Sequence, residues 1–503
     1  MKKSIVSLLV VFVLLISGCG APLASQPATT APCIHVDGDD SGKCDICFQS
    51  VMVKIDLYVL NDLHGKLDDG ENHPGVDELT TYLKRKQLSD DHVVLLSSGD
   101  MWQGSAESNM TKGLIITDWM NEMGFVAMTL GNHEFDWGES FIEENAKLAE
   151  FPFLAINVYD RETEQPVEYC KGSVMIERGG IQIGIIGAIG DCYSSISSDH
   201  IKEIYFKTGS ELTELVKAES QRLRQEGADF IVYSIHDGYG QSNNGNLSSA
   251  TASQLRSYYD VSLSNGYVDL VFEGHSHQRY LMQDEYGVYH LQGGGDNKGI
   301  THAEIGFNSV TGSYAVTERD FYYTSTYESL PDDPIVDQLL DKYQEMIAPS
   351  NRILGYNAAY RSGDFLRQLV AQLYLEAGVA RWGEEYDIVL GGGFLSVRSP
   401  YNLEKGDVSY ATLQSIMPFD NELVLCSVKG SDLLSKFINT SNSNYFIARS
   451  DNRTIDPNGT YYIIVDSYTS TYAPNRLTEI ERYGAEIYAR DLLAEYIAQG
   501  KLA

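Results

Sequence analysis

Hydrophobic residues occur along the chain mainly in short continuous runs, separated by amphipathic stretches. Seven runs predict buried strands, at 51–60, 93–96, 126–130, 153–156, 181–189, 230–235 and 268–272. Amphipathic stretches between them, such as Val76–Lys86 and Ser210–Gln225, predict helices. Alternation of strands and helices predicts an α/β fold.

A second segment of the same type follows the first. A strand-rich region ends near Thr326, and the pattern of Pro334–Ile347 then predicts a connecting helix. A further α/β segment starts near Gly355. We therefore expect a larger domain over 51–335, a linker helix over 336–354 and a smaller domain over 355–503.

The N-terminus predicts export. Lys2 and Lys3 precede a mainly apolar run from Ile5 to Ile16, which is shorter than the ~20 residues that cross a bilayer and is typical of a secretory signal. The ending Ser17-Gly18-Cys19 resembles a bacterial lipobox, which implies that Cys19 is lipidated. The alternative is an ordinary signal peptide with a chance cysteine. We expect a signal peptide over 1–19 and a chain anchored by lipid to the outer face of the bacterial cytoplasmic membrane.

Charge and composition narrow the function. The chain has 37 Lys and Arg residues against 70 Asp and Glu residues, which gives a formal net charge of −33. A surface that binds nucleic acid requires clustered basic residues. Binding to polymeric nucleic acid is therefore excluded, whereas this acidity favours the capture of cations. With 43% hydrophobic residues, the chain is neither disordered nor fibrous.

Residues 20–50 are expected to form a tether that carries a small cluster of cysteine and histidine. Its members are Cys33, His35, Cys44 and Cys47. Their spacing fits a structural zinc site, and in an exported chain it equally fits a disulfide with one cysteine left over. Neighbouring acidic residues also make calcium conceivable: Asp37, Asp39 and Asp40. The three remaining cysteines are scattered and expected to be buried or unremarkable: Cys170, Cys192 and Cys426.

Five predicted strands end in Asp, Asn or His beside glycine. These ends are Asn61-Asp62-Leu63-His64-Gly65, Gly99-Asp100, Gly131-Asn132-His133-Glu134-Phe135-Asp136, His236-Asp237-Gly238 and Glu273-Gly274-His275-Ser276-His277. Sites in α/β sheets form beyond the carboxyl ends of strands, so we expect these side chains to converge. Such residues bind hard or borderline divalent cations, and glycine lets the backbone turn sharply beside them.

These motifs, in this order along one chain, resemble the signature of the calcineurin-like metallophosphoesterases. Asn-Asp-x-His-Gly together with Gly-Asn-His-Glu-Phe-Asp is similar to the bacterial 5′-nucleotidase/nucleotide-sugar hydrolase family. The likeness runs from about residue 55 to 497 and is looser in the second domain. It implies a four-layer α/β metallophosphoesterase domain, a smaller α/β substrate-binding domain and a two-metal hydrolase.

The resemblance also implies the ligands of both metals. One metal would be bound by Asp62, His64 and His277, the other by Asn132, His236 and His275, with Asp100 bridging them. Zn, Mn, Fe and Co all suit these ligands. Two cations ~3.5–4 Å apart lower the pKa of a bridging water and clamp phosphate oxygens.

The motif around Asn132 also supplies candidate catalytic residues. Because the side chains of adjacent residues diverge, His133 is expected to point at the phosphate rather than bind the same metal as Asn132. Asn132 itself is predicted to be both a metal ligand and a member of the catalytic group. Asp136, three residues on, could hold His133 protonated. The alternative is that His133 and Asp136 only support the ligands.

The second domain matches the resembled family less well. By resemblance, Phe419 and Tyr468 would stack on a nucleobase with Asn421 nearby, the alternative being core residues. Leu395 stands where the family has an arginine that contacts the nucleotide, and Arg398 could reach the same place. Residues 472–475 replace the family's Gly-Gly-Asp-Gly-Tyr. These departures affect the substrate, not the metal chemistry.

We therefore expect an exported phosphoesterase that converts 5′-nucleoside monophosphates to nucleoside and phosphate. Alternatives with the same centre are a 2′,3′-cyclic nucleotide phosphodiesterase and a UDP-sugar hydrolase. A surface nucleotide- or metal-binding protein without turnover is the alternative of another class, and a phosphoprotein phosphatase would leave the second domain unused. The expected partners are a small nucleotide and the membrane.

Overall fold

The computed structural model describes residues 34–69, 74–240, 243–246, 259–398, 402–441, 444–472, 476–484 and 488–503. The predicted signal peptide, Cys19 and Cys33 lie outside the described residues. The chain divides into two compact units. One consists of the residues up to Met52 together with Asn308–Ser313, and the other of Val53–Phe307 and Tyr314–Ala503.

The first sheet of the larger unit has six strands. In spatial order they are β15 (Tyr314–Tyr323), β14 (Gly299–Asn308), β1 (Met52–Leu60), β2 (Val93–Ser97), β3 (Ala127–Thr129) and β4 (Phe153–Leu154). From β1 to β4 the strands are parallel, and β14 and β15 pair antiparallel. The parallel strands therefore deliver their carboxyl ends to one edge.

A second sheet of seven strands carries the remaining candidate ligands. Its order is β10 (Asn243–Asn246), β12 (Arg279–Gln283), β13 (Tyr289–Gly293), β11 (Leu270–Glu273), β9 (Phe230–His236), β7 (Ile181–Ile189) and β6 (Ser173–Arg178). The central strands β7, β9 and β11 are parallel. A separate antiparallel pair joins β5 (Val158–Asp160) to β8 (Ile204–Phe206).

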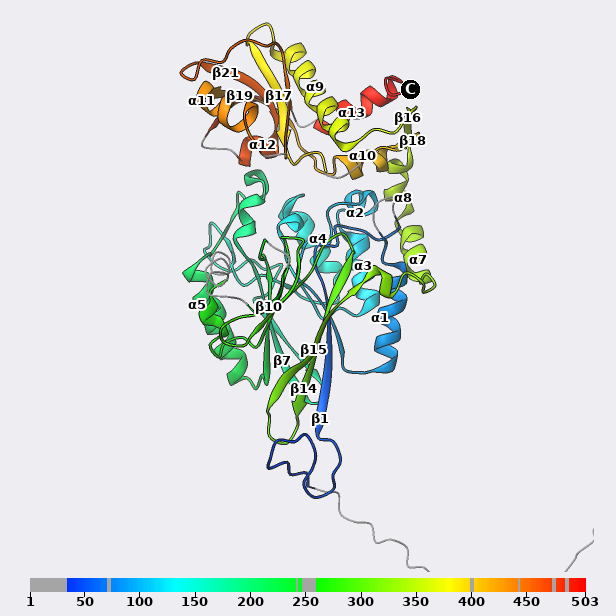
Figure 1. The fold of residues 1–503 in the computed structure, drawn as a ribbon, viewed down its shortest axis with the longest axis vertical. Helices are drawn as coiled ribbons and strands as arrows, with labels where there is room; N and C mark the ends of the chain where they lie inside the picture. The colour runs from blue at the N-terminus through cyan, green and yellow to red at the C-terminus, as the bar shows by residue number, and fades with distance from the viewer. Residues whose placement is uncertain are drawn as a thin grey trace, which may run out of the picture. The chain divides into compact units, whose positions relative to one another are not determined.

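The two sheets pack face to face between helices. Alternate residues of β1 enter different cores: Ile55 and Val59 face the second sheet, whereas Tyr58 and Leu60 join the helix-covered core. Helices beside the first sheet are α1 (Asp77–Ser89), α2 (Ala106–Thr111), α3 (Leu114–Met123) and α4 (Glu139–Leu148). Helix α5 (Ser210–Gln225) covers the other flank (Figure 1). This helix–sheet–sheet–helix arrangement is the expected four-layer fold.

The C-terminal segment builds its own core. Its sheet runs β20 (Tyr445–Arg449), β17 (Ile388–Phe394), β21 (Thr460–Asp466), β19 (Leu423–Lys429) and β22 (Leu477–Arg482). Helices α9 (Gly363–Trp382), α10 (Tyr410–Ile416) and α13 (Ala489–Ala498) share one core with this sheet. On the opposite face lie α11 (Gly430–Asp432) and the π-helical turn η7 (Leu433–Ile438), while α12 (Ser467–Tyr472) follows β21. A small antiparallel pair joins β16 (Ile353–Asn357) to β18 (Gly406–Ser409).

The predicted elements form in the predicted order, and the α/β prediction is confirmed. All seven predicted strands are present, although β3, β4 and β11 are shorter than their hydrophobic runs. The predicted linker region holds α7 (Pro334–Lys342) and α8 (Gln344–Ile347), where Asp333 caps α7 through the backbone N–H of Ile335 at 3.0 Å. None of the described helices is long and apolar enough to span a membrane.

Candidate metal centre

The predicted ligands converge from both sheets. They follow or end β1, β2 and β3 of the first sheet and β9 and β11 of the second. The ligand atoms of Asp62, His64 and His277 lie within 4.8 Å of one another, as do those of Asp62, Asp100 and His236. Asp62 is therefore common to two sets, and the sets merge into one buried centre.

Backbone carbonyls orient two of the histidine rings. His64 donates its Nδ1–H to the carbonyl of Gln103 at 2.8 Å, and His236 donates its Nδ1–H to the carbonyl of Ser98 at 2.6 Å. Each ring is thereby oriented with Nε2 towards the centre, and in the neutral form of the imidazole this is the nitrogen that can bind a metal.

The Nε2 atoms of His64 and His236 point at other predicted ligands. Nε2 of His64 lies 3.0 Å from Nε2 of His277. Nε2 of His236 is buried and makes no hydrogen bond to a described residue, although Asp100 Oδ2 lies 3.1 Å away. Imidazole nitrogens and a carboxylate oxygen that converge in this way are what a bound cation requires.

The charges also fit cations. Asp62 and Asp100 are buried. Burial raises the pKa of Asp100, but His236 and His133 outweigh it and hold that pKa well below its ordinary value. Conversely, burial lowers the pKa of His236, but Asp100 and Asp62 raise it to about 10. Without a cation, a histidine must neutralise these carboxylates, so the residues present fit a dinuclear divalent centre.

Five of the seven candidate ligands hold a strained backbone. Their φ angles lie between 52° and 65°, in the left-handed region that residues other than glycine rarely adopt: Asp62, His64, Asp100, His275 and His277. Such strain costs on the order of 1–3 kcal/mol per residue and clusters at functional sites. The ligand loops are therefore shaped for the site rather than for local stability.

Glycine is needed beside His236. A Cβ on Gly131 would lie 2.3 Å from Asp100 Oδ1 and 2.9 Å from His236 Nε2. A Cβ on Gly99, where φ is +91°, would lie 2.6 Å from His236 Nδ1. The glycines that flank the motifs thus let the ligand loops approach the imidazole closely.

Asn132 and His275 meet on the other side of the centre. His275 Nδ1 lies 2.9 Å from Asn132 Oδ1. The backbone N–H of His275 donates to the Asp62 carboxylate at 3.0 Å, which ties the loop after β11 to the loop after β1. All seven predicted ligands are therefore brought together; their role as ligands remains a prediction.

His133 diverges from Asn132, as expected. Its ring stacks on Phe419 at 5.6 Å and lies edge-on to His64 at 5.2 Å. His133 Nδ1 lies 2.7 Å from Asp136 Oδ2. Burial lowers the pKa of His133, but Asp136 and Asp100 raise it above the ordinary value. The raised pKa favours the protonated ring, which can donate a proton beside the centre.

Predicted residues of the C-terminal segment fall into two places. The Arg398 guanidinium lies 5.4 Å from the Phe419 ring, and its Nη2 donates to Gln103 Oε1 at 3.4 Å. Asn421 instead accepts from the Ser467 hydroxyl at 3.5 Å, next to Tyr468. The Tyr468 ring is parallel to that of Phe394, with centroids 6.3 Å apart. Phe419 and Arg398 therefore border the centre, whereas Tyr468 and Phe419 belong to different ring pairs.

Sequence reasoning missed three residues near the centre. Cys192, expected to be buried or unremarkable, donates its thiol to the carbonyl of His236 at 2.8 Å and lies within 4.8 Å of the ligand atoms of His236 and His275. Gln103 contacts His64 and Arg398. Burial lowers the pKa of Lys66 to about 8. Only Lys66, directly after Asp-x-His-Gly, had a local motif that could have revealed it.

A family model described as calcineurin-like phosphoesterase matches residues 55–279. Residues 55–279 are a calcineurin-like phosphoesterase domain. The phosphoesterase domain contains all seven predicted ligands, and proteins with this domain use a dinuclear divalent metal centre.

Relatives extend the likeness beyond the phosphoesterase domain. Protein UshA of Yersinia enterocolitica is 26% identical over 429 residues, covering 75% of each chain. The 5′-nucleotidase of Diplobatis ommata is 24% identical over 422 residues, covering 75% of this chain and 69% of the relative. The structure of a 5′-nucleotidase precursor from Thermus thermophilus matches with a TM-score of 0.67 at 18% identity, covering 89% of this chain and 97% of the other. The predicted relationship to 5′-nucleotidases is confirmed, and so is the predicted α/β C-terminal domain.

Proposed function

We propose that the protein hydrolyses 5′-nucleoside monophosphates to nucleoside and phosphate. The proposal rests on the position of Phe419 and Arg398 beside His133, at the rim of the candidate metal centre. A flat apolar ring and a guanidinium there provide a surface for a base and a charge for a phosphate. The names of the relatives, 5′-nucleotidase and UshA, support the same class of substrate.

The residues have separable tasks in this reaction. Two divalent cations, when bound, activate water and offset the charge of the phosphoryl group. Asp62, His64 and His277 would hold one cation and Asn132, His236 and His275 the other, with Asp100 shared between them. His133, oriented by Asp136, donates its proton to the phosphoryl or leaving oxygen.

One observation favours a second candidate, a 2′,3′-cyclic nucleotide. Leu395 occupies the position of the resembled family's arginine and is 39% exposed, with φ at 59°. Loss of a guanidinium weakens binding of a dianionic monophosphate more than binding of a monoanionic cyclic ester, because the Coulomb attraction scales with the ligand's charge.

We also propose that the protein works at the cell surface. The proposal is supported by the secretory pattern of residues 1–19 and by Cys19 as the lipid attachment site. A nucleotidase there would act on extracellular nucleotides. Labelling cells with a radioactive fatty acid would detect the lipid on the wild-type protein, and Cys19→Ser should abolish the label.

Phosphate release from a substrate panel tests the activity. The mature chain, loaded with Mn²⁺ or Zn²⁺, is assayed with nucleoside monophosphates, 2′,3′-cyclic nucleotides, a UDP-sugar and a simple aryl phosphate. For the cyclic nucleotides and the UDP-sugar, a coupled phosphomonoesterase releases phosphate from the phosphomonoester products. We expect the highest kcat/KM with a nucleoside monophosphate. A preference for the cyclic ester would select the second candidate.

Matched variants connect turnover to the centre. Asp100→Asn removes the shared carboxylate and should abolish turnover, whereas Asp91→Asn, an exposed residue just before β2, should not. Nucleotide binding without release of any product by the metal-loaded wild type would instead indicate a binding protein.

A further inference from the structure

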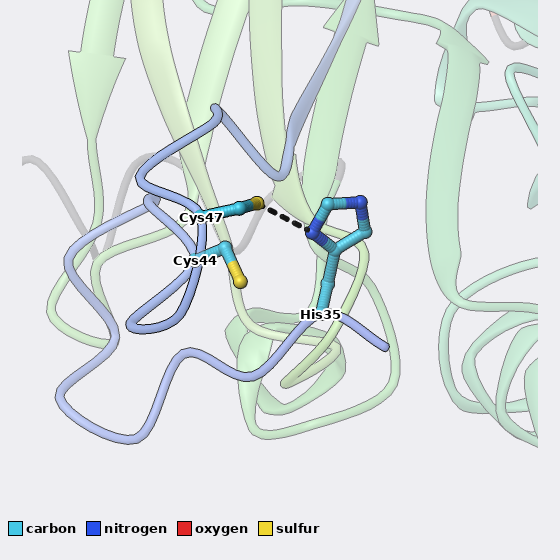
Figure 2. Close-up of side chains that lie close together, drawn as sticks. All are labelled: His35, Cys44 and Cys47. Carbon is cyan, nitrogen blue, oxygen red and sulfur yellow. Dashed lines mark hydrogen bonds between the residues drawn. The ribbon is translucent and has the colours of Figure 1, made fainter. Parts of the chain in front are cut away.

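We propose that His35, Cys44 and Cys47 form a binding site for a zinc-type divalent cation, separate from the phosphoesterase centre. The three side chains come together within the small N-terminal unit (Figure 2). Their ligand atoms lie within 4.8 Å of one another. Two thiols and one imidazole are the soft and borderline ligands that zinc prefers.

The spacing of the atoms suits zinc. Cys47 Sγ and His35 Nδ1 are 3.5 Å apart (Figure 2). With Zn–S near 2.3 Å and Zn–N near 2.0–2.1 Å, a tetrahedral zinc holds such a sulfur and nitrogen about 3.6 Å apart. The pair is therefore already at the separation that the ion requires.

A backbone hairpin presents the two cysteines. Lys43 and Ser50 form an antiparallel bridge, and the N–H of Cys44 donates to the carbonyl of Gln49 at 2.9 Å. The N–H of Phe48 donates back to the carbonyl of Cys44 at 2.8 Å, and Phe48 takes a left-handed φ of 62° to do so. The resulting turn directs both thiols to one side. Strain at a bulky residue such as Phe48 persists where the surrounding structure requires it.

A second contact fixes the histidine against this turn. The N–H of Asp45, inside the Cys-x-x-Cys turn, donates to the carbonyl of Val36 at 2.7 Å. Val36 directly follows His35, so the segment that carries the imidazole is tied to the segment that carries the thiols. This contact brings the two predicted parts of the cluster, the segment of His35 and the segment of Cys44 and Cys47, into one site.

The acidic residues of the unit are committed elsewhere. Asp37 accepts from the backbone N–H of Gly42 at 2.7 Å and from the Asn308 side chain at 2.5 Å. One oxygen of Asp40 accepts from Asn308, Thr311 and Ser313. These oxygens face N–H and O–H donors, so they stabilise the fold of the unit. A calcium site built on them is not favoured.

The unit also needs a cross-link. The described part of the unit, residues 34–52 and 308–313, is small, and small domains usually depend on disulfides, metals or oligomerisation. Its large apolar side chains are mostly exposed, with Ile34 at 83% and Phe48 at 77%. Buried apolar surface therefore contributes little here, and metal ligation provides the missing stabilisation.

Metal counting on the mature chain tests the site without reference to activity. After saturation with Zn²⁺ and removal of excess, elemental analysis should find one equivalent more in the wild type than in Cys44→Ser/Cys47→Ser. The control Cys170→Ser/Cys426→Ser removes two thiols elsewhere and should keep the full count. An equal count in wild type and Cys44→Ser/Cys47→Ser would overturn the proposal.

Cobalt provides a spectroscopic check on the ligands. Co²⁺ bound by thiolates gives an intense charge-transfer absorption that nitrogen and oxygen ligands do not give. We expect this absorption in the wild type and its loss in Cys44→Ser/Cys47→Ser. Persistence of the full band in that variant would place the thiolate elsewhere, Cys192 included, and contradict the proposal.

Substitutions of the histidine separate ligation from folding. His35→Cys retains a ligand and should keep the extra zinc, whereas His35→Ala should weaken its binding by at least roughly tenfold. Equal affinity in both variants would remove His35 from the site. Alkylation and mass spectrometry of the exported protein distinguish zinc binding from the competing disulfide. A disulfide that includes Cys44 or Cys47 would overturn the proposal.

Discussion

The carboxylate of Glu134 holds the backbone of Asp100 in place. Glu134 Oε2 accepts the N–H of Asp100 at 2.9 Å, and its Oε1 accepts the N–H of Met101 at 2.8 Å. The same Oε2 accepts the N–H of Gly131, just before Asn132, at 2.6 Å. One fully buried side chain thus ties the loop after β2 to the loop after β3, so two predicted ligands share one anchor.

Glu134→Gln should loosen this anchor without removing a ligand. In glutamine one of the two oxygens becomes an NH₂ group, which cannot accept a hydrogen bond from a backbone N–H. One of the two loops must therefore shift. We expect metal affinity to fall roughly 10- to 100-fold, as for other groups that orient ligands, and kcat to fall with it. Titration of the metal-free enzyme with Mn²⁺, followed by turnover at saturation, separates the two effects. Glu143→Gln, an exposed change on α4, is the control; identical metal binding in both variants would argue against the anchor.

His133→Ala should spare metal binding and remove most turnover. His133 lies beside the ligands, and its ring contacts Phe419 and pairs with Asp136. Loss of a general acid costs typically 10²- to 10⁴-fold in rate. Metal content by elemental analysis and kcat with the preferred substrate are the two measurements. A rate near the wild type would rule out a catalytic role.

Asp136→Asn tests the same pair through its pH dependence. The Asp136 carboxylate raises the pKa of His133, so its removal should lower that pKa. Because protonated His133 is the donor, the alkaline limb of the kcat profile should move to lower pH. An unshifted limb would show that the proton comes from another group.

Phe419→Ala should affect nucleotides more than simple phosphates. Base stacking contributes about 1–3 kcal/mol, which predicts a KM increase of roughly fivefold to a hundredfold for a nucleoside monophosphate. An aryl phosphate without a nucleobase should change less. Phe365→Ala in α9 is the control, because Phe365 also lies under an arginine, Arg361. Equal losses on both substrates would make Phe419 a core residue.

Much of the phosphoesterase domain could be predicted from sequence because its signals are local. Buried parallel strands are continuous apolar runs, and a strand end followed by Asp, Asn or His and glycine marks a ligand loop. The positions of Asp62 and Asp100 follow from this pattern. Strand ends were less predictable: the run at 126–130 yields only Ala127–Thr129, because Leu130 and Gly131 already belong to the ligand loop.

Contacts between segments that are distant in the sequence could not be predicted from the local sequence pattern. Cys192 reaches His236, and Gln103 orients His64, only because the fold brings their loops together. The same is true of the pairing of Tyr468 with Phe394. A motif gives the residue type at a position, but the identity of its neighbour depends on the packing of the whole sheet.

Another group that no motif revealed is a buried ionic cluster behind the loop of His275. His290 Nδ1 lies 2.7 Å from Glu273 Oε1, and His290 Nε2 lies 3.3 Å from Asp284 Oδ2, with all three side chains buried. The Tyr280 hydroxyl donates to the second oxygen of Glu273, and the Tyr259 ring packs edge-on against His290. Burial lowers the pKa of His290, but Asp284 and Glu273 raise it to about 9.

This cluster predicts a specific loss of stability at alkaline pH. An unfolded histidine titrates near 6.5, so the folded state retains a proton that the unfolded state loses. The resulting stabilisation is complete below about pH 6.5 and disappears as the pH rises through about 9, a change of up to roughly 3 kcal/mol. Urea unfolding of the metal-saturated protein between pH 6 and 10 measures it. His290→Gln should be less stable than the wild type at pH 6, with a difference that narrows towards pH 10, whereas His92→Gln, at a half-buried histidine outside the cluster, should follow the wild type throughout. A difference between His290→Gln and wild type that is constant across this range would mean that His290 is not protonated in the folded protein.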